Sequence, residues 1–188
     1  MKKIIYFLIA FIAINTNAQM IVTMTHNNSR DAQDGNYIKD TEGYLDKFLG
    51  TWKYTNSTEE FIIKIVKGEQ IAGDGYYIDR LFGGYKYMKD GIVKVNNLNF
   101  QYTDYSSPQN FADFSGSGLS TNYMIIGLPG YDRVGYRRVR ITLEVIPNTN
   151  PIQMKWKMEN RENIVINNEG FKQGTGPGLP NNIILIKQ

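Results

Sequence analysis

From Gly50 to the C-terminus, apolar and polar residues alternate in several stretches with a period of two. In "RRVRITLEVI" every second residue from Val139 to Val145 is apolar, and the residues between are charged or polar. The stretch "IQMKWKMEN" repeats the pattern, with Ile152, Met154, Trp156 and Met158 on one side. A strand with one buried face shows this alternation. The pattern therefore predicts an antiparallel sheet with one face towards a core.

Turn and helix signals divide the chain further. Asp90-Gly91 in "YKYMKDGIVKV" supplies the positive backbone angles of a tight hairpin turn. Ahead of the strands, "DTEGYLDKFLG" has a helical spacing of apolar residues, with Asp40 or Thr41 as a cap and Gly50 as a terminator. The apolar residues of this face are Tyr44, Leu45, Phe48 and Leu49. We expect one short N-terminal helix followed by the strands.

Many strands joined by short turns favour an all-β, antiparallel up-and-down β-barrel of about eight strands. Closing the sheet removes its unpaired edges. A β-sandwich built from the same strands is the structural alternative. Two stretches without clear alternation, 96–122 and 167–182, are predicted to be long loops. Such loops can form the mouth of a barrel or remain unstructured.

The N-terminal stretch "MKKIIYFLIAFIAINTNAQ" has a basic start, a short apolar run and small residues before Gln19. These are the parts of a secretory signal peptide, and the apolar run is shorter than the roughly 20 residues of a membrane span. We therefore expect cleavage after Ala18 and export to the periplasm or beyond. Residues 19–39 are polar and predict a flexible lead-in, in which Met20 to Met24 are apolar enough to add a strand. Residues 40–188 form the barrel domain.

Composition limits the classes of function. The net charge of +3 falls to +1 when the two lysines of the signal peptide are removed, which does not favour nucleic-acid binding. The chain has no cysteine, so it has neither disulfides nor a thiolate nucleophile. The single histidine, His26, lies in the polar lead-in, which argues against a Ser-His-Asp triad or a multi-histidine metal site. We expect neither a metal nor a cofactor.

Gly50, Thr51 and Trp52, preceded by Phe48, form a Gly-x-Trp step between a short helix and the first strand. This step resembles the first signature of the lipocalins, and the secretory signal and strand meander fit the same family. The chain is also similar to small secreted lipocalin-like proteins of Gram-negative bacteria, many of which have no assigned function. The resemblance implies a barrel whose closed end is filled by Trp52, with Gly50 allowing the chain to turn beneath it.

Two further lipocalin signatures have counterparts here. Thr103-Asp104-Tyr105 matches the letters of the second, although it lies nearer to the Gly-x-Trp step than the family pattern places it. The third is an arginine that stacks on the tryptophan, for which Arg138 and Arg140 are the candidates. A cation over an indole contributes about 0.5–2 kcal/mol.

Other groups of reactive residues have simpler interpretations. Ser115 and Ser117 in "FSGSGLS" lack the strand-turn-helix context of a nucleophile elbow. The arginine-rich stretch "YDRVGYRRVR" is interpreted as a solvated strand face rather than an anion site. Asp79, Glu144 and Glu159 lie on separate predicted strands, so a pair of carboxylates for glycoside hydrolysis stays an open alternative.

Aromatic residues concentrate in the central third of the chain. They can line a pocket or pack as the interior of a barrel. Those proposed as ligand-binding are Tyr77, Phe82, Tyr85, Tyr87, Phe100 and Tyr102. The leading hypothesis is a non-enzymatic exported module that binds a small apolar or amphipathic ligand in the barrel or at its mouth. The alternative is a closed-core structural or interaction domain of the cell envelope, and a carbohydrate hydrolase is the third hypothesis.

Overall fold

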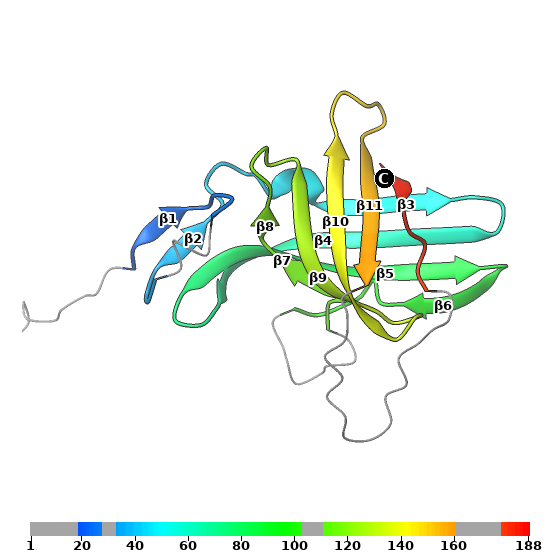
Figure 1. The fold of residues 1–188 in the computed structure, drawn as a ribbon, viewed down its shortest axis with the longest axis horizontal. Helices are drawn as coiled ribbons and strands as arrows, with labels where there is room; N and C mark the ends of the chain where they lie inside the picture. The colour runs from blue at the N-terminus through cyan, green and yellow to red at the C-terminus, as the bar shows by residue number, and fades with distance from the viewer. Residues whose placement is uncertain (1–18, 28–32, 103–110, 161–177) are drawn as a thin grey trace, which may run out of the picture.

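The structure is a computed structural model that describes residues 19–27, 33–102, 111–160 and 178–188 (Figure 1). These residues form one sheet of 12 strands and a 3-10 turn, η1 (Asp46–Phe48). None of the described segments forms a helix with the length and apolarity of a membrane span. The strands are β1 (Ile21–Thr23), β2 (Tyr37–Lys39), β3 (Gly50–Thr55), β4 (Glu59–Ala72), β5 (Tyr77–Lys89), β6 (Ile92–Asn96), β7 (Phe114–Gly116), β8 (Gly118–Leu119), β9 (Ile125–Asp132), β10 (Arg137–Ile146), β11 (Gln153–Asn160) and β12 (Ile183–Lys187).

Eight of the strands close into an antiparallel barrel. Its ring runs β3, β4, β5, β7, β9, β10, β11 and β12, in chain order, and the last strand pairs with the first. Lys187 of β12 lies opposite Trp52 of β3, while β7 closes the other gap by pairing with both β5 and β9. The up-and-down barrel predicted from the alternation is therefore confirmed, and the β-sandwich alternative is not.

The expected N-terminal helix is reduced to the single turn η1. The Asp40 carboxylate accepts hydrogen bonds from the backbone N–H groups of Tyr44 and Leu45, at 2.7 and 3.0 Å, just before η1 begins at Asp46. Leu45 and Phe48 are buried, so one turn satisfies the helical spacing seen in the sequence. A longer helix would need further hydrogen-bonded turns to offset the unfavourable free energy of nucleation, but no residues remain for them because β3 begins at Gly50.

The lead-in contributes ordered structure, although the sequence predicts it to be mainly flexible. β1 pairs in parallel with β2, and β2 pairs in parallel with the start of β5. Buried Asp79 anchors this addition, because its carboxylate accepts hydrogen bonds from the Tyr37 hydroxyl at 2.6 Å and from the N–H groups of Asp40 and Gln70 at 3.0 Å. The lead-in is fixed by a buried carboxylate distant in sequence.

The stretch 96–122, predicted to be a loop, contains β7 and β8. β7 is only three residues long, which is too short for a recognisable alternation, yet it seals the barrel. Phe114 of β7 packs inward beside Gly83 of β5, where an added Cβ would lie 2.0 Å from the Phe114 ring. The next residue, Gly84, leaves room on the outside for the backbone of Asn97, whose oxygen would lie 2.2 Å from a Cβ. Two successive glycines thus admit close neighbours on both faces of β5.

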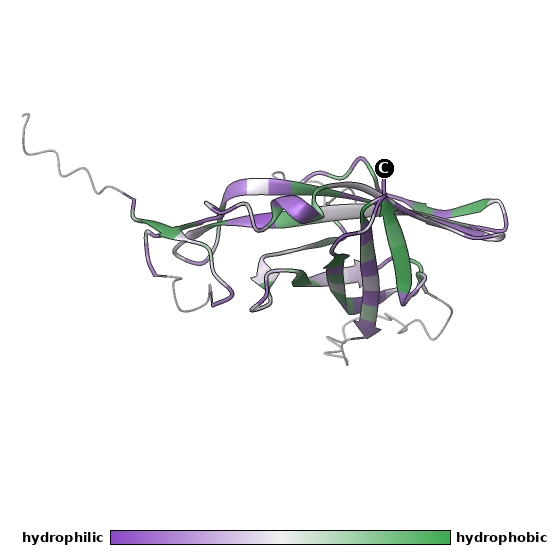
Figure 2. Cartoon of the chain, turned by 90° about the horizontal axis from the view of Figure 1, so that it is seen from above, coloured by the Kyte–Doolittle hydropathy of each residue, from purple (hydrophilic) through white to green (hydrophobic). Residues whose placement is uncertain are grey.

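Side chains fill the interior of the barrel. Alternating apolar and polar positions along the strands are visible in Figure 2, and the apolar positions form one continuous core. At its centre, the Phe61 ring packs on Tyr85, Tyr87 and Trp156, with ring centroids 5.8, 6.3 and 5.1 Å away. Trp156 in turn lies 5.9 Å from Phe114. In the described part of the chain, these aromatic side chains therefore pack against one another at the centre of the barrel.

A cross-strand charge cluster on the outside gives a testable pH dependence. Glu60 of β4 lies between Lys53 and Lys86, at 2.7 and 3.1 Å. Hydrogen bonds from these two lysines lower the pKa of Glu60. The pKa of Glu60 in the folded protein lies below the unfolded value of about 4.3. The ionised carboxylate therefore adds to the free energy of unfolding at neutral pH, and this stabilisation is lost as the pH falls through the unfolded pKa and then the folded pKa.

Replacing Glu60 with glutamine is expected to lower the free energy of unfolding at pH 7 by up to about 1 kcal/mol, since the pair is partly exposed. The difference from the parent protein should shrink towards pH 3 in urea denaturation at both pH values. Gln70 lies outside this cluster, so Gln70→Ala should show no such pH-dependent difference. A gap between Glu60→Gln and the parent that stays constant down to pH 3 would contradict the assignment.

Candidate functional site

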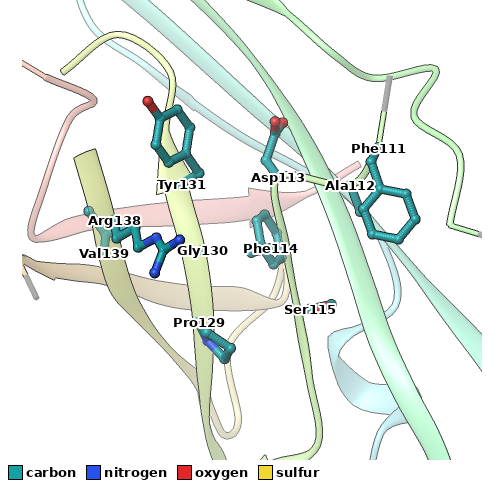
Figure 3. Close-up of a pocket in the computed structure, with 10 residues that line it drawn as sticks. All are labelled: Phe111, Ala112, Asp113, Phe114, Ser115, Pro129, Gly130, Tyr131, Arg138 and Val139. Atoms are coloured by element: carbon teal, nitrogen blue, oxygen red, sulfur yellow. The ribbon is translucent and has the colours of Figure 1, made fainter. Parts of the chain in front are cut away.

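An open groove lies over the seam between β7 and β9 and extends to β10 (Figure 3). Only one residue pair, Phe114 opposite Gly130, joins β7 to β9. The groove has a volume of about 600 Å³. Its lining residues are Phe111, Ala112, Asp113, Phe114, Ser115, Pro129, Gly130, Tyr131, Arg138 and Val139.

The outward-facing residues of β9 and β10 give the groove its chemistry. Leu128 is buried in the core, so the alternation of β9 turns Pro129 and Tyr131 outward. Tyr131 lies opposite Arg138 in the register of the two strands, and Phe111 lines another part of the groove. The groove therefore combines aromatic and aliphatic walls with one guanidinium.

Among the described residues, Arg138 forms no ion pair, unlike Arg133 and Arg137. Arg133 and Arg137 form ion pairs with Asp113 and Asp132, and Arg140 lies opposite Glu159 in the strand register. Among the described residues, no carboxylate lies within ion-pair distance of Arg138, which is exposed. Its charge is available to an anion in the groove.

Asp113 forms a buried polar junction under the groove. Its Oδ1 accepts hydrogen bonds from Arg133 Nε and from Asn97 Nδ2, the latter at 3.0 Å, and its Oδ2 accepts from the Tyr85 N–H at 3.1 Å. Burial raises the pKa of the Asp113 carboxyl, and the hydrogen bond from Arg133 opposes this effect. The junction joins β5, β7 and the end of β9.

A second buried carboxylate, Asp132, has a similar set of partners. Its Oδ1 accepts from the N–H groups of Val134 and Gly135 at 3.0 and 2.8 Å, and its Oδ2 accepts from Arg137 Nε at 3.1 Å. Gly178 packs so closely here that a Cβ on it would lie 2.2 Å from the Asp132 carboxylate. Both aspartates are thus occupied by three donors each, in an arrangement that holds strand ends together.

Two of the aromatic residues proposed as ligand-binding belong to the packed interior. The Tyr85 hydroxyl donates to the Tyr131 carbonyl at 2.9 Å and accepts from the Arg133 N–H at 2.8 Å. The Tyr87 hydroxyl donates to Glu59 at 2.6 Å. Burial raises the pKa of both phenols, and for Tyr87 the hydrogen bond to Glu59 adds to the effect. Both hydroxyls are therefore engaged in hydrogen bonds within the protein.

The other four lie elsewhere. Phe82 is buried on the outer face of β5, where its ring stacks on Tyr102 at 4.8 Å between centroids. Phe100 covers Gly84 on the same outer face, and Tyr77 is exposed at the start of β5. The structure thus divides the six residues among the core, the outer wall and the solvent.

Trp52 lies at the end of the barrel closed by η1. Its side chain is completely buried, and its Nε1 donates to the Phe48 carbonyl at 2.9 Å. Gly50 has a φ of 109°, a backbone conformation that favours glycine. The ammonium group of Lys187 lies 5.3 Å from the indole centroid, whereas Arg138 lies at the groove.

The remaining candidate residues are scattered. His26 packs edge-on against Tyr123, with ring centroids 6.3 Å apart. Arg140 lies against Gly127 on the outer wall of β9. The Thr103-Asp104-Tyr105 signature and the signal peptide, residues 1–18, lie outside the described residues. In the parts of the chain that are described, no group of three metal-ligating side chains occurs.

The sequence did not indicate the groove residues as a set. Phe111 and Asp113 fall in the stretch predicted to be a loop, and Tyr131 comes from the far end of β9. The arginine-rich stretch "YDRVGYRRVR" was the one available signal, because it contains both Tyr131 and Arg138. Only the pairing of β7 with β9 brings these residues together.

The fold and the groove define a small, closed antiparallel β-barrel with an apolar core and an open groove on its wall. Comparison with family models assigns the chain to a family. Over residues 1–188 it matches a family described as "Family of unknown function (DUF6705)", and it belongs to that family. Comparisons with curated proteins and with solved structures gave no match.

Proposed function

We propose that this protein is an exported lipocalin-like barrel module that binds a small amphipathic anion in the groove over β7, β9 and β10. The observation that carries the proposal is the groove itself, with a volume of about 600 Å³ and with Arg138, with which no described carboxylate pairs, opposite Tyr131. Binding sites for small molecules have volumes of about 300–1,000 Å³ and few polar groups among apolar walls. An anionic head group would contact Arg138, and the apolar body would lie along Pro129, Tyr131 and Phe111.

The packed interior supports a site on the wall of the barrel rather than inside it. A ligand within the barrel would have to displace Phe61 or Trp156, which contact each other at 5.1 Å in the core. Displacing a buried aromatic side chain would cost several kcal/mol. The groove needs no such rearrangement, because it is already open.

Binding is favoured over catalysis because the buried carboxylates have defined structural partners. Asp113 and Asp132 each accept three hydrogen bonds, including one from an arginine. A general acid or base must exchange a proton with its substrate, and these carboxylates are directed at the protein's own donors. Export is supported by the sequence pattern of the first 18 residues.

The binding experiment uses a fluorescent fatty acid, 11-(dansylamino)undecanoic acid, with oleate as the competitor. The protein should enhance the probe's emission, and oleate should reverse the enhancement. Replacing Arg138 with glutamine should weaken binding about 5- to 30-fold, because a charge-assisted contact of roughly 1–2 kcal/mol is lost.

Arg140→Gln is the matched control for the binding experiment. It removes the same charge from the same face of β10, but Arg140 does not line the groove. Equal losses in the two variants would indicate a general charge effect and contradict the assignment. No enhancement by the parent protein would contradict the groove as a site for amphipathic anions.

Mass spectrometry of the protein from the periplasm and medium of an expressing Gram-negative host tests export, with Gln19 as the expected first residue.

The second candidate is a closed-core interaction domain without a small-molecule ligand. The packed interior around Phe61 and Trp156 favours it, since nothing about the core requires a cargo. The same titration separates the two functions. A folded protein that binds neither the dansyl probe nor oleate would support the interaction domain.

A further inference from the structure

β1 is the first strand in the order of the sheet, and among the described residues it pairs on one side only, with β2. The strand order begins with β1, next to β2, outside the closed barrel. In Figure 1 the two strands extend to one side of the barrel. In the described residues β6 and β8 also pair on one side only, with β5 and β9, whereas β1 ends the main strand order.

The hydrogen bonds between β1 and β2 show which backbone groups face outward. The Tyr37 N–H donates to the Met20 carbonyl at 2.8 Å, and the Met24 N–H donates to the Lys39 carbonyl at 2.7 Å. In a parallel pair, alternate residues direct both backbone groups to the same neighbour. Val22 therefore directs its N–H and C=O groups towards β2, and those of Ile21 and Thr23 point away from it. Within the described residues, no backbone hydrogen bond engages these outward groups.

The side chains of this edge lack the features that keep edge strands apart. The stretch from Gln19 to Thr25, "QMIVTMT", has no charge and no proline. Charged residues, prolines and bulges are the usual protection of an edge. Met20 and Ile21 are 64% and 60% exposed, which is high for large apolar side chains.

We propose that the protein forms a two-fold symmetric dimer in which β1 pairs antiparallel with β1 of a second copy. With Val22 at the centre of the pair, Ile21 lies opposite Thr23 of the other copy, and Thr23 lies opposite Ile21. Each of these two pairs exchanges two hydrogen bonds between the outward N–H and C=O groups, which gives four in all. The edge is therefore complementary to itself.

The lack of charge favours a second copy as the partner. Because no side chain from Gln19 to Thr25 is charged, two identical edges meet without like-charge repulsion between their side chains. The exposed side chains of Met20 and Ile21 become partly covered in the same contact. Closed two-fold pairing also uses all the outward groups of Ile21 and Thr23, which leaves no edge for further copies in this register.

Sedimentation equilibrium of the purified protein, in the form that accumulates in expressing cells, tests the dimer. We expect a concentration-dependent shift from monomer to dimer mass. Ile21→Pro removes an outward N–H but no hydrogen bond between β1 and β2, so it should weaken the dimer at least about 10-fold. Ile21→Thr keeps the N–H and should dimerise nearly as well as the parent protein.

Circular dichroism and thermal unfolding establish that Ile21→Pro is folded, and Thr23→Pro provides a second variant of the same kind. Hydrogen exchange gives an independent measurement. The amides of Ile21 and Thr23 should become protected as protein concentration rises, while that of Val22 is protected throughout. A monomer at every concentration up to 1 mM (roughly the affinity limit of a weak specific contact) would overturn the proposal, as would a dimer unaffected by both proline variants.

Discussion

Replacing Trp52 with alanine is expected to lower the free energy of unfolding by about 3–5 kcal/mol. The indole is completely buried at the closed end of the barrel, and its removal leaves a cavity beside Phe48 and Lys187. It also leaves the Phe48 carbonyl without its hydrogen bond of 2.9 Å. Since small domains are stable by only about 5–15 kcal/mol, this single change removes a large part of the total. Urea denaturation followed by circular dichroism measures it.

Two variants define the origin of this loss. Trp52→Phe keeps most of the ring but removes the donor, so it should cost about 1–2 kcal/mol. Tyr136 is an aromatic residue with 65% of its surface exposed, and Tyr136→Ala should change stability by less than about 0.5 kcal/mol. If Trp52→Ala were as mild as Tyr136→Ala, the indole would not be filling the end of the barrel.

Replacing Asp113 with alanine is expected to cost about 2–4 kcal/mol. The change leaves the Tyr85 N–H, Asn97 Nδ2 and Arg133 Nε without their acceptor. A buried donor that loses its partner costs about 1–3 kcal/mol, and partial exposure of Arg133 moderates the charge penalty. The loss should appear as a lower urea midpoint with an unchanged slope.

Arg133→Gln and the double variant complete the test of the Asp113 junction. If the two side chains act as a pair, the double variant should be less destabilised than the sum of the single variants by about 1 kcal/mol or more. Strict additivity would show that Asp113 and Arg133 act independently. Glu144→Ala on the exposed face of β10 is the control for loss of a carboxylate and should cost less than about 0.5 kcal/mol.

Local patterns determined most of the barrel strands. The alternation from Val139 to Val145 predicted the buried face of β10, and all four apolar residues in it are at most 7% exposed. Asp90-Gly91 predicted the hairpin between β5 and β6, where both residues have positive φ values of 52° and 74°. These features depend on neighbours in sequence, so one chain is enough to find them.

Features that depend on distant contacts could not be found in this way. The helix expected from Leu45 and Phe48 became a 3-10 turn because β3 starts immediately after it. β7 was missed since three residues carry no periodic signal, and β1 and β2 are held by the side chain of Asp79. In each case an interaction with a remote segment outweighed the local preference.

The sequence by itself determined the class of fold, because a period of two over successive short segments has few solutions other than a closed or layered antiparallel sheet. Only the tertiary structure decided which aromatic side chains pack in the interior and where the groove lies. The composition of the central third is the same whether its aromatic residues point inward or outward, so composition cannot distinguish the two arrangements. Strand pairing settles that choice, and it divides Tyr85 from Phe82 and brings Phe114 to Gly130, since this register depends on contacts between strands that are not neighbours in sequence.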